Sequence, residues 1–191
     1  MDMNLFYEEY PTFIKVHNEE IPIVTDFRSY VQLMDMLNDA NLNSGEKFEM
    51  LKQYFKEEIS DFGEAIDALV EFVTMEELPK CGHNAQGTEE SDSNKKELYS
   101  FSVDYPFIFS AFLHEYGINI RTVPYMHWWE FRMLFDGLSE DTEIMKRIMY
   151  RSINLNEIRD KDERKRIEKI QALIRLPDDL PNDFDIGDAF W

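Results

Sequence analysis

The sequence predicts a mainly α-helical protein with a short N-terminal β-hairpin and a flexible acidic central loop. Three observations support this fold class. Apolar residues recur at helical spacing through most of the chain, with polar residues between them. Strict alternation at every second position occurs near the N-terminus, between residues 12 and 24. One central stretch, residues 79–96, has neither periodicity nor large apolar side chains, which is typical of a surface loop.

The segment 12–24 is predicted to form the hairpin because its isoleucines and valines alternate with other residues. Residues 17–20 supply the turn, in which we expect Asn18 to take a positive φ. Pro22 cannot donate a hydrogen bond to a neighbouring strand. It therefore confines the second strand to an edge, or to a partner on one side.

Three amphipathic helices are expected next. Thr25, Ser44 and Asp61 each precede an apolar stripe and are predicted N-caps. Glu64 follows Asp61 by three residues, which is the spacing of a capping box. The third helix has the most regular stripe in the chain: Phe62, Ala65, Ile66, Leu69, Val70 and Val73.

Four more helices are predicted in the C-terminal half. Proline near the start and glycine at the end bound two of them, over 104–117 and 124–137. The acid-rich segment 139–143 opens a third helix, because acidic side chains favour helix N-termini. Residues 159–175 show helical periodicity and form the fourth.

These elements suggest two folded units joined by a linker. Residues 1–78 form an N-terminal unit of hairpin and helices, and residues 98–176 form an aromatic helical C-terminal unit. The flexible linker or loop covers 79–97, and residues 177–191 form an acidic tail. The length of the chain fits one domain, or one domain with appendages. The alternative to a linker is that the central stretch is a loop of variable length.

The composition narrows the class of partner. The chain has 20 Lys and Arg against 39 Asp and Glu, a formal net charge of −19. This charge disfavours nucleic acid and anionic membranes as partners, and no apolar run approaches the length of a membrane span. The single cysteine and the absence of a basic, apolar leader at the start predict a cytoplasmic protein.

No catalytic, cofactor-binding or metal-binding site is predicted. The Cys81-x-His83 pair lacks a second ligand pair at zinc-site spacing, and His127-x-x-Glu130 lacks the second copy that a di-metal bundle needs. Seven glycines include no nucleophile elbow and no phosphate loop. We therefore expect no cofactor and no enzymatic activity.

Adjacent tryptophans stand in the most aromatic part of the chain. Successive residues of a helix point about 100° apart. Trp128 shares a face with Phe131 and is assigned to the core, whereas Trp129, Tyr125 and Met133 lie on another face and are predicted to bind a protein. The alternative is a wide core-facing arc that covers both tryptophans.

A second predicted protein-binding element is the C-terminal pair Phe190 and Trp191, which ends an acidic segment. The alternative is that this end is frayed or docks on its own domain.

Three segments together resemble the gene-product-fifteen proteins of tailed phages and prophages: DYPFIFSAFLHEYGINI, HWWEFRMLFDGL and IMYRSINL. The hairpin leading into TDFRSYVQL resembles them too, so the match runs through nearly the whole chain. Two departures are Phe109 and Asn119, where the family pattern has Tyr and Asp.

The resemblance implies a small helical protein encoded between the tail-tube and tape-measure genes. It implies a tail-assembly chaperone without enzymatic activity, which binds the tape-measure protein, the tail-tube protein or both in the bacterial host cytoplasm. One alternative is a structural component that stays in the phage tail. Another is a small metal-dependent enzyme. The oligomeric state is left open.

Overall fold

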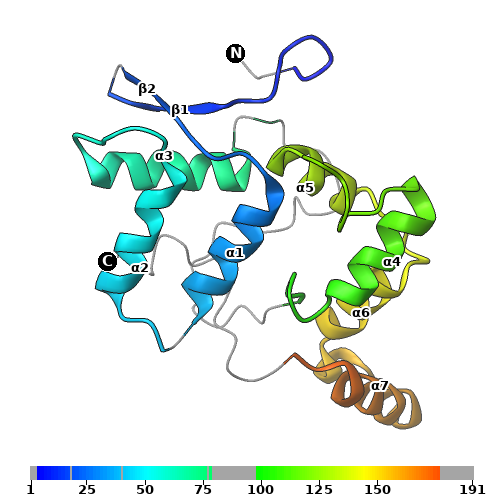
Figure 1. Ribbon diagram of the computed structural model, residues 1–191. Coiled ribbons are helices and arrows are strands. Elements are labelled where there is room, and N and C mark those ends of the chain that lie inside the picture. The colour runs from blue at the N-terminus through cyan, green and yellow to red at the C-terminus, as the bar shows by residue number, and fades with distance from the viewer. Residues whose placement is uncertain (1–3, 18, 40, 77, 79–97, 177–191) are drawn as a thin grey trace. The chain divides into compact units, whose positions relative to one another are not determined.

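The computed structural model describes residues 4–17, 19–39, 41–76, 78 and 98–176 (Figure 1). The fold class is confirmed, since these residues form seven α-helices and one two-stranded hairpin. The elements are β1 (Phe13–Val16), β2 (Glu19–Pro22), α1 (Phe27–Asn38), α2 (Ser44–Leu51), η1 (Lys52–Tyr54), α3 (Phe62–Thr74), α4 (Tyr105–Tyr116), α5 (Trp128–Asp136), α6 (Glu143–Ser152), η2 (Leu155–Glu157) and α7 (Lys161–Ile174). The predicted linker and tail lie outside the described residues.

The chain divides into two compact units. Of the described residues, the first unit comprises those up to 78 together with Tyr125–Phe131, and the second comprises 98–124 and 132–176. The segment Tyr125–Phe131, predicted to lie in the C-terminal unit, therefore belongs to the first. Among the described helices, none combines the length and apolar character needed to cross a membrane.

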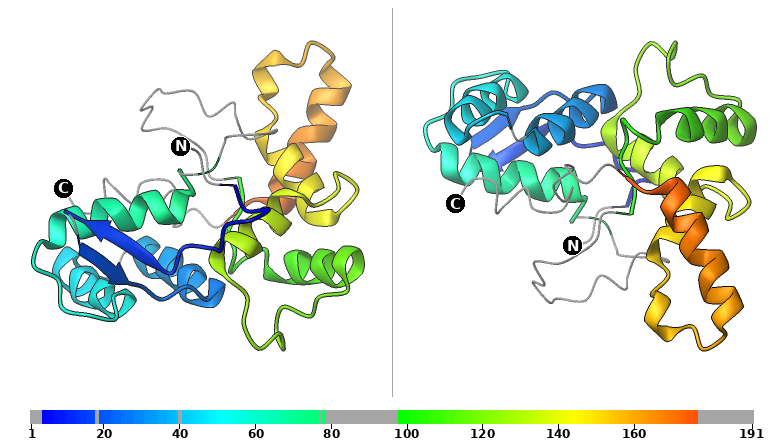
Figure 2. Two further views of the ribbon diagram at one scale, coloured as in Figure 1. Left: turned by 90° about the horizontal axis from the view of Figure 1, so that it is seen from above. Right: turned by 90° about the horizontal axis from the view of Figure 1, so that it is seen from below.

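The hairpin is antiparallel and packs along α3 in the first unit (Figure 2). Ile14 pairs with Ile21, and Val16 pairs with Glu19, so the connection is only two residues long. His17 takes the positive φ, at 54°, while Asn18, where we expected it, lies outside the described residues. Histidine is among the residues that tolerate this conformation in turns.

The cap of α1 differs from the prediction. Asp26, one residue after Thr25, caps this helix by accepting from the Arg28 backbone N–H at 2.9 Å. The Thr25 hydroxyl is hydrogen-bonded at 2.9 Å to the hydroxyl of Tyr125. Thr25 therefore joins two distant segments of the first unit instead of capping its own helix.

The predicted cap of α2 is one residue off, whereas the predicted cap of α3 is correct. Asn43, one residue before the predicted Ser44, caps α2 and forms a full capping box with Glu46. Asp61 caps α3 as predicted, by accepting from the Glu64 backbone N–H at 3.2 Å. The Glu64 carboxylate accepts instead from the backbone N–H of His17 at 2.9 Å, which ties α3 to the hairpin turn.

The second unit is built from α4, the later turns of α5, α6 and α7. Gly117 ends α4 as predicted, with φ 67° and its N–H bonded to the Phe112 carbonyl. The next two helices begin later than predicted, at Trp128 and Glu143. Its buried apolar side chains include Phe101, Ile108, Ala111, Phe112, Ile120, Phe135, Leu138, Ile144 and Ile167.

Candidate functional site

The two adjacent tryptophans are both buried, each with 0% of its surface exposed. The Trp128 indole N–H donates to the Val73 carbonyl at 3.0 Å, and the Trp129 indole N–H donates to the Phe72 carbonyl at 2.8 Å. These carbonyls lie in the last turn of α3, where the usual donors four residues further along are missing. The Phe72 carbonyl also accepts from the N–H of the cap residue Met75 at 3.3 Å. The prediction that Trp129 faces outward is wrong. The alternative holds: the buried face of the first turn of α5 is wide enough to include both tryptophans.

The tryptophans reach α3 because their segment is anchored to the start of α1. Trp128 donates its backbone N–H to the Thr25 carbonyl at 2.8 Å, and Phe27 donates to the Met126 carbonyl at 3.1 Å. Asp26 and His127 are thus paired as in an antiparallel ladder. Helices α1 and α5 both begin at this short ladder, about 100 residues apart in sequence.

His127 is the N-cap of α5, and both of its ring nitrogens are used. Nδ1 accepts from the Trp129 backbone N–H at 3.0 Å, and Nε2 lies 3.0 Å from the Pro11 carbonyl. This pattern assigns the proton to Nε2, because a carbonyl can only accept. Burial lowers the pKa of His127 below its ordinary value. The imidazole therefore acts as a neutral structural group, and it stacks on Tyr10.

The other residues predicted to bind a protein differ in how exposed they are. Tyr125 is 54% exposed, and Met133 is partly buried. Phe190 and Trp191 lie outside the described residues. Two exposed aromatics that sequence reasoning missed are Phe6, 96% exposed, and Tyr7.

Phe6 and Tyr7 belong to the same unit as Tyr125. The chain that carries them reaches the Tyr125–Phe131 segment within a few residues, because Tyr10 and Pro11 both contact His127. In the sequence, the aromatic pair follows Leu5 and precedes two glutamates, and this neighbouring charge was the available sign that the pair is exposed. Exposed tyrosine and phenylalanine side chains are the residue types that anchor protein interfaces.

The second unit contains a buried ion pair between α4 and α6. Arg151 and Asp104 are 4% and 1% exposed. Arg151 donates from Nη1 to Asp104 Oδ2 at 2.6 Å and from Nη2 to Oδ1 at 2.9 Å, the forked geometry that suits a carboxylate. Asp104 is the N-cap position of α4, but its side chain makes no cap hydrogen bond to that helix.

The same guanidinium also donates to two backbone carbonyls. Nε donates to Ile174 at the end of α7 at 2.8 Å, and Nη1 donates to Leu98 at 3.0 Å. Asp104 in turn accepts from the Ser100 backbone N–H at 3.1 Å. One side chain thereby connects α4, α6, α7 and the segment before α4, which gives Arg151 a structural role.

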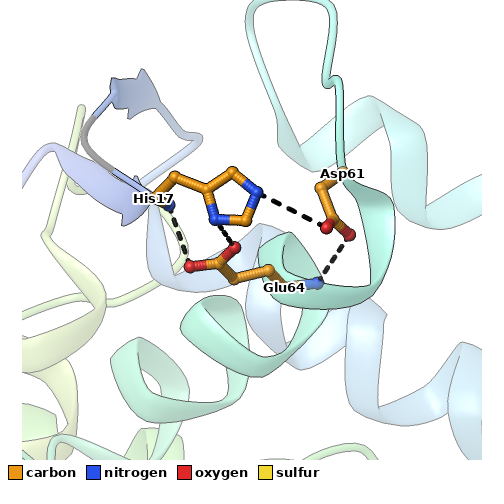
Figure 3. A group of neighbouring side chains, drawn as sticks. All are labelled: His17, Asp61 and Glu64. Atoms are coloured by element: carbon orange, nitrogen blue, oxygen red, sulfur yellow. Dashed lines mark hydrogen bonds and ion pairs between the residues drawn. The ribbon is translucent and has the colours of Figure 1, made fainter.

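A third group stands on the exposed side of the first unit, where the hairpin turn meets the N-terminus of α3 (Figure 3). His17 comes from the turn, and Asp61 and Glu64 come from the start of α3. Their side chains point toward one another, and one nitrogen or oxygen from each lies within 4.8 Å of the others. Among the described residues, this is the group whose donor atoms could hold a metal ion.

Sequence reasoning missed this group, although it placed His17 in a turn and the two acids in one helix start. The pairing of a hairpin with a helix across 47 residues is a property of the fold. By contrast, the His127 and Glu130 pair considered from the sequence is not brought together as a ligand set, since both nitrogens of His127 already have partners.

The family model described as Bacteriophage Gp15 protein matches residues 6–176. This match confirms the resemblance carried by the three aromatic segments, and it extends over both compact units. Among curated proteins and among solved structures, none matches the chain.

Proposed function

The chain belongs to the Bacteriophage Gp15 protein family, and we propose that this phage protein is a tail-assembly chaperone. It would bind the tape-measure protein, the tail-tube protein or both before the tail is complete, in the cytoplasm of the bacterial host, without catalysis. The observation that carries the proposal is the family match over most of the chain. The physical properties of the described residues support it.

The charge of the chain suits the task of holding an aggregation-prone partner. A tape-measure protein is a long helical chain with apolar stripes, which must not self-associate before the tube forms around it. A holder with a formal charge of −19 keeps the complex soluble, and it repels further copies of itself. Apolar contacts can then supply affinity while charge supplies solubility.

Exposed aromatic side chains of the first unit are the proposed contacts. Phe6, Tyr7 and Tyr125 present apolar surface to solvent, whereas Trp128 and Trp129 are buried in the core. Amphipathic helices bind partners through apolar anchors at helical spacing, which is the pattern that a tape-measure chain presents. The buried tryptophans would hold the segment that carries Tyr125 in a fixed position.

Co-expression with fragments of the tape-measure protein from the same phage or prophage tests the proposal. We expect at least one fragment to become soluble and to co-purify with this chain. Binding should survive an increase from low to moderate salt, because screening shortens the range of charge interactions, from about 10 Å at 0.1 M to about 3 Å at 1 M, but leaves apolar contacts intact. A complex that dissociates steeply with salt would contradict the apolar mode.

Matched surface variants locate the contact. Phe6→Ser combined with Tyr7→Ser, or Tyr125→Ser alone, should reduce co-purification. Leu173→Ser, which alters an 85% exposed apolar residue of α7 in the second unit, is the control and should not. Unchanged unfolding midpoints would show that the aromatic variants remain folded.

Deletion of the gene distinguishes the chaperone from a structural tail component. Without the chaperone, capsids should fill with DNA while tails are absent or malformed. Mass spectrometry of purified particles should find this chain absent or strongly substoichiometric. Normal tails from the deletion strain would refute a role in assembly, and a fixed stoichiometric copy number in particles would favour the structural component.

A further inference from the structure

We propose that His17, Asp61 and Glu64 form a binding site for one divalent transition-metal ion, with Zn²⁺ as the representative ion. The site lies wholly within the first unit, between the turn of the β1–β2 hairpin and the first turn of α3 (Figure 3). It is independent of the proposed chaperone activity and would serve to fasten the hairpin to the helix.

Both carboxylates are already oriented by backbone donors, with one oxygen of each still directed at the imidazole. Asp61 Oδ1 accepts from the Glu64 backbone N–H, and Glu64 Oε1 accepts from the His17 backbone N–H at 2.9 Å. Asp61 Oδ2 then lies 3.6 Å from His17 Nε2, and Glu64 Oε2 contacts His17 Nδ1. Hydrogen bonds that fix the non-ligating oxygen are what orient carboxylate ligands at metal sites.

The spacing of these atoms suits a small ion. Ligand atoms about 2.1 Å from zinc in a tetrahedron are roughly 3.4 Å from one another. The three ligand atoms here lie within 4.8 Å of one another, so small side-chain adjustments must bring them closer around an ion. The His17 side chain is 63% exposed and has room to rotate.

The donor set selects the class of ion. An imidazole nitrogen suits zinc, copper, nickel and iron, whereas magnesium and calcium prefer oxygen ligands alone. Three protein ligands on an exposed surface leave the remaining positions to water. The N-terminal end of α3 opposes a cation with roughly half a positive charge, but the two carboxylates outweigh it.

The competing arrangement is a polar cluster in which the two acids contact His17 without a metal. Both arrangements use the same three residues, and they differ in whether the chain takes up a stoichiometric ion. Calorimetric titration of the full chain with Zn²⁺, after chelator treatment and removal of the chelator, measures this directly. We expect one equivalent with micromolar affinity, and a rise in thermal midpoint when Zn²⁺ is added.

Three conservative variants remove one ligand each while keeping the residue's structural task. His17→Asn retains a residue that tolerates positive φ. Asp61→Asn retains a good N-cap. Glu64→Gln retains an acceptor for the His17 N–H. Each should weaken Zn²⁺ binding at least tenfold and abolish the rise in thermal midpoint, while the metal-free midpoint changes little.

Two controls make the result specific. His114→Asn removes an exposed histidine of α4 in the second unit and should leave the affinity unchanged. Cys81→Ser combined with His83→Ala removes other zinc-binding side chains of the chain and should also leave it unchanged. The proposal is overturned if the wild-type chain takes up no Zn²⁺ at submillimolar concentration. It is equally overturned if binding persists in His17→Asn or disappears in the Cys81 and His83 variant.

Discussion

Replacing Arg151 by methionine should cost about 3–5 kcal/mol in the free energy of unfolding, because it leaves a buried carboxylate without its partner. Asp104 is 1% exposed and would retain the Ser100 backbone N–H among its present contacts. The carbonyls of Leu98 and Ile174 also lose a charged donor. Each such bond is worth about 1.5–3 kcal/mol, but the losses are not additive because all of them involve one side chain.

Two further variants separate charge from geometry. Arg151→Lys keeps the positive charge but loses the planar fork that spans both carboxylate oxygens, so we expect it to recover only part of the loss. Asp104→Asn removes the buried charge. In the double variant Arg151→Met with Asp104→Asn, the total loss should be at least about 1 kcal/mol smaller than the sum of the two single losses.

Urea denaturation followed by far-UV circular dichroism measures these differences, provided that the slope with urea stays constant among the variants. A loss below about 1 kcal/mol for Arg151→Met would place the pair among surface ion pairs and refute the reasoning. Strict additivity of the two single variants would refute the direct coupling, even if each alone is costly.

Three other measurements test the remaining features. Trp128→Phe and Trp129→Phe each delete an indole N–H bonded to α3 and should cost similar amounts, about 1–3 kcal/mol, whereas a neutral Trp129→Phe would show that this side chain is not buried. Burial lowers the folded-state pKa of His127, so the unfolded chain binds the proton first. The stability that depends on neutral His127 is complete above pH 6.5 and declines below it, and His127→Asn should remove this part of a pH series of unfolding midpoints. Gly117→Ala should cost about 1 kcal/mol because its φ is 67°, whereas Gly63→Ala, inside α3, should be neutral or stabilising in the same urea assay.

Helix content could be predicted from the sequence because apolar periodicity is a local signal. The stripes preceded by Asp26, Asn43 and Asp61 all became helices, but only Asp61 was identified as a cap in advance. The cap of α1 was missed because the hydroxyl of Thr25 is hydrogen-bonded to Tyr125, 100 residues away. Capping rules consider only neighbouring residues, so they cannot predict a hydrogen bond to a side chain so far away in the sequence.

The sites were harder to predict for the same reason. The direction of Trp129 depends on the Phe72 carbonyl, 57 residues earlier, and the partner of Arg151 is Asp104, 47 residues earlier. Helical periodicity places two adjacent side chains about 100° apart but does not give the width of the buried arc. The His17 group likewise requires the hairpin to pack on α3, which no spacing in the sequence reveals.

These contacts change the meaning of the aromatic motif that carries the family resemblance. His127 caps α5, and Trp128 and Trp129 together bind the end of α3, so all three side chains are committed to holding the first unit together. Loss of tail assembly in a Trp129 variant would therefore be the expected consequence of unfolding, and it would carry no information about a binding surface. Only variants of exposed residues that keep the unfolding midpoint, such as Phe6→Ser, can connect this fold to a partner.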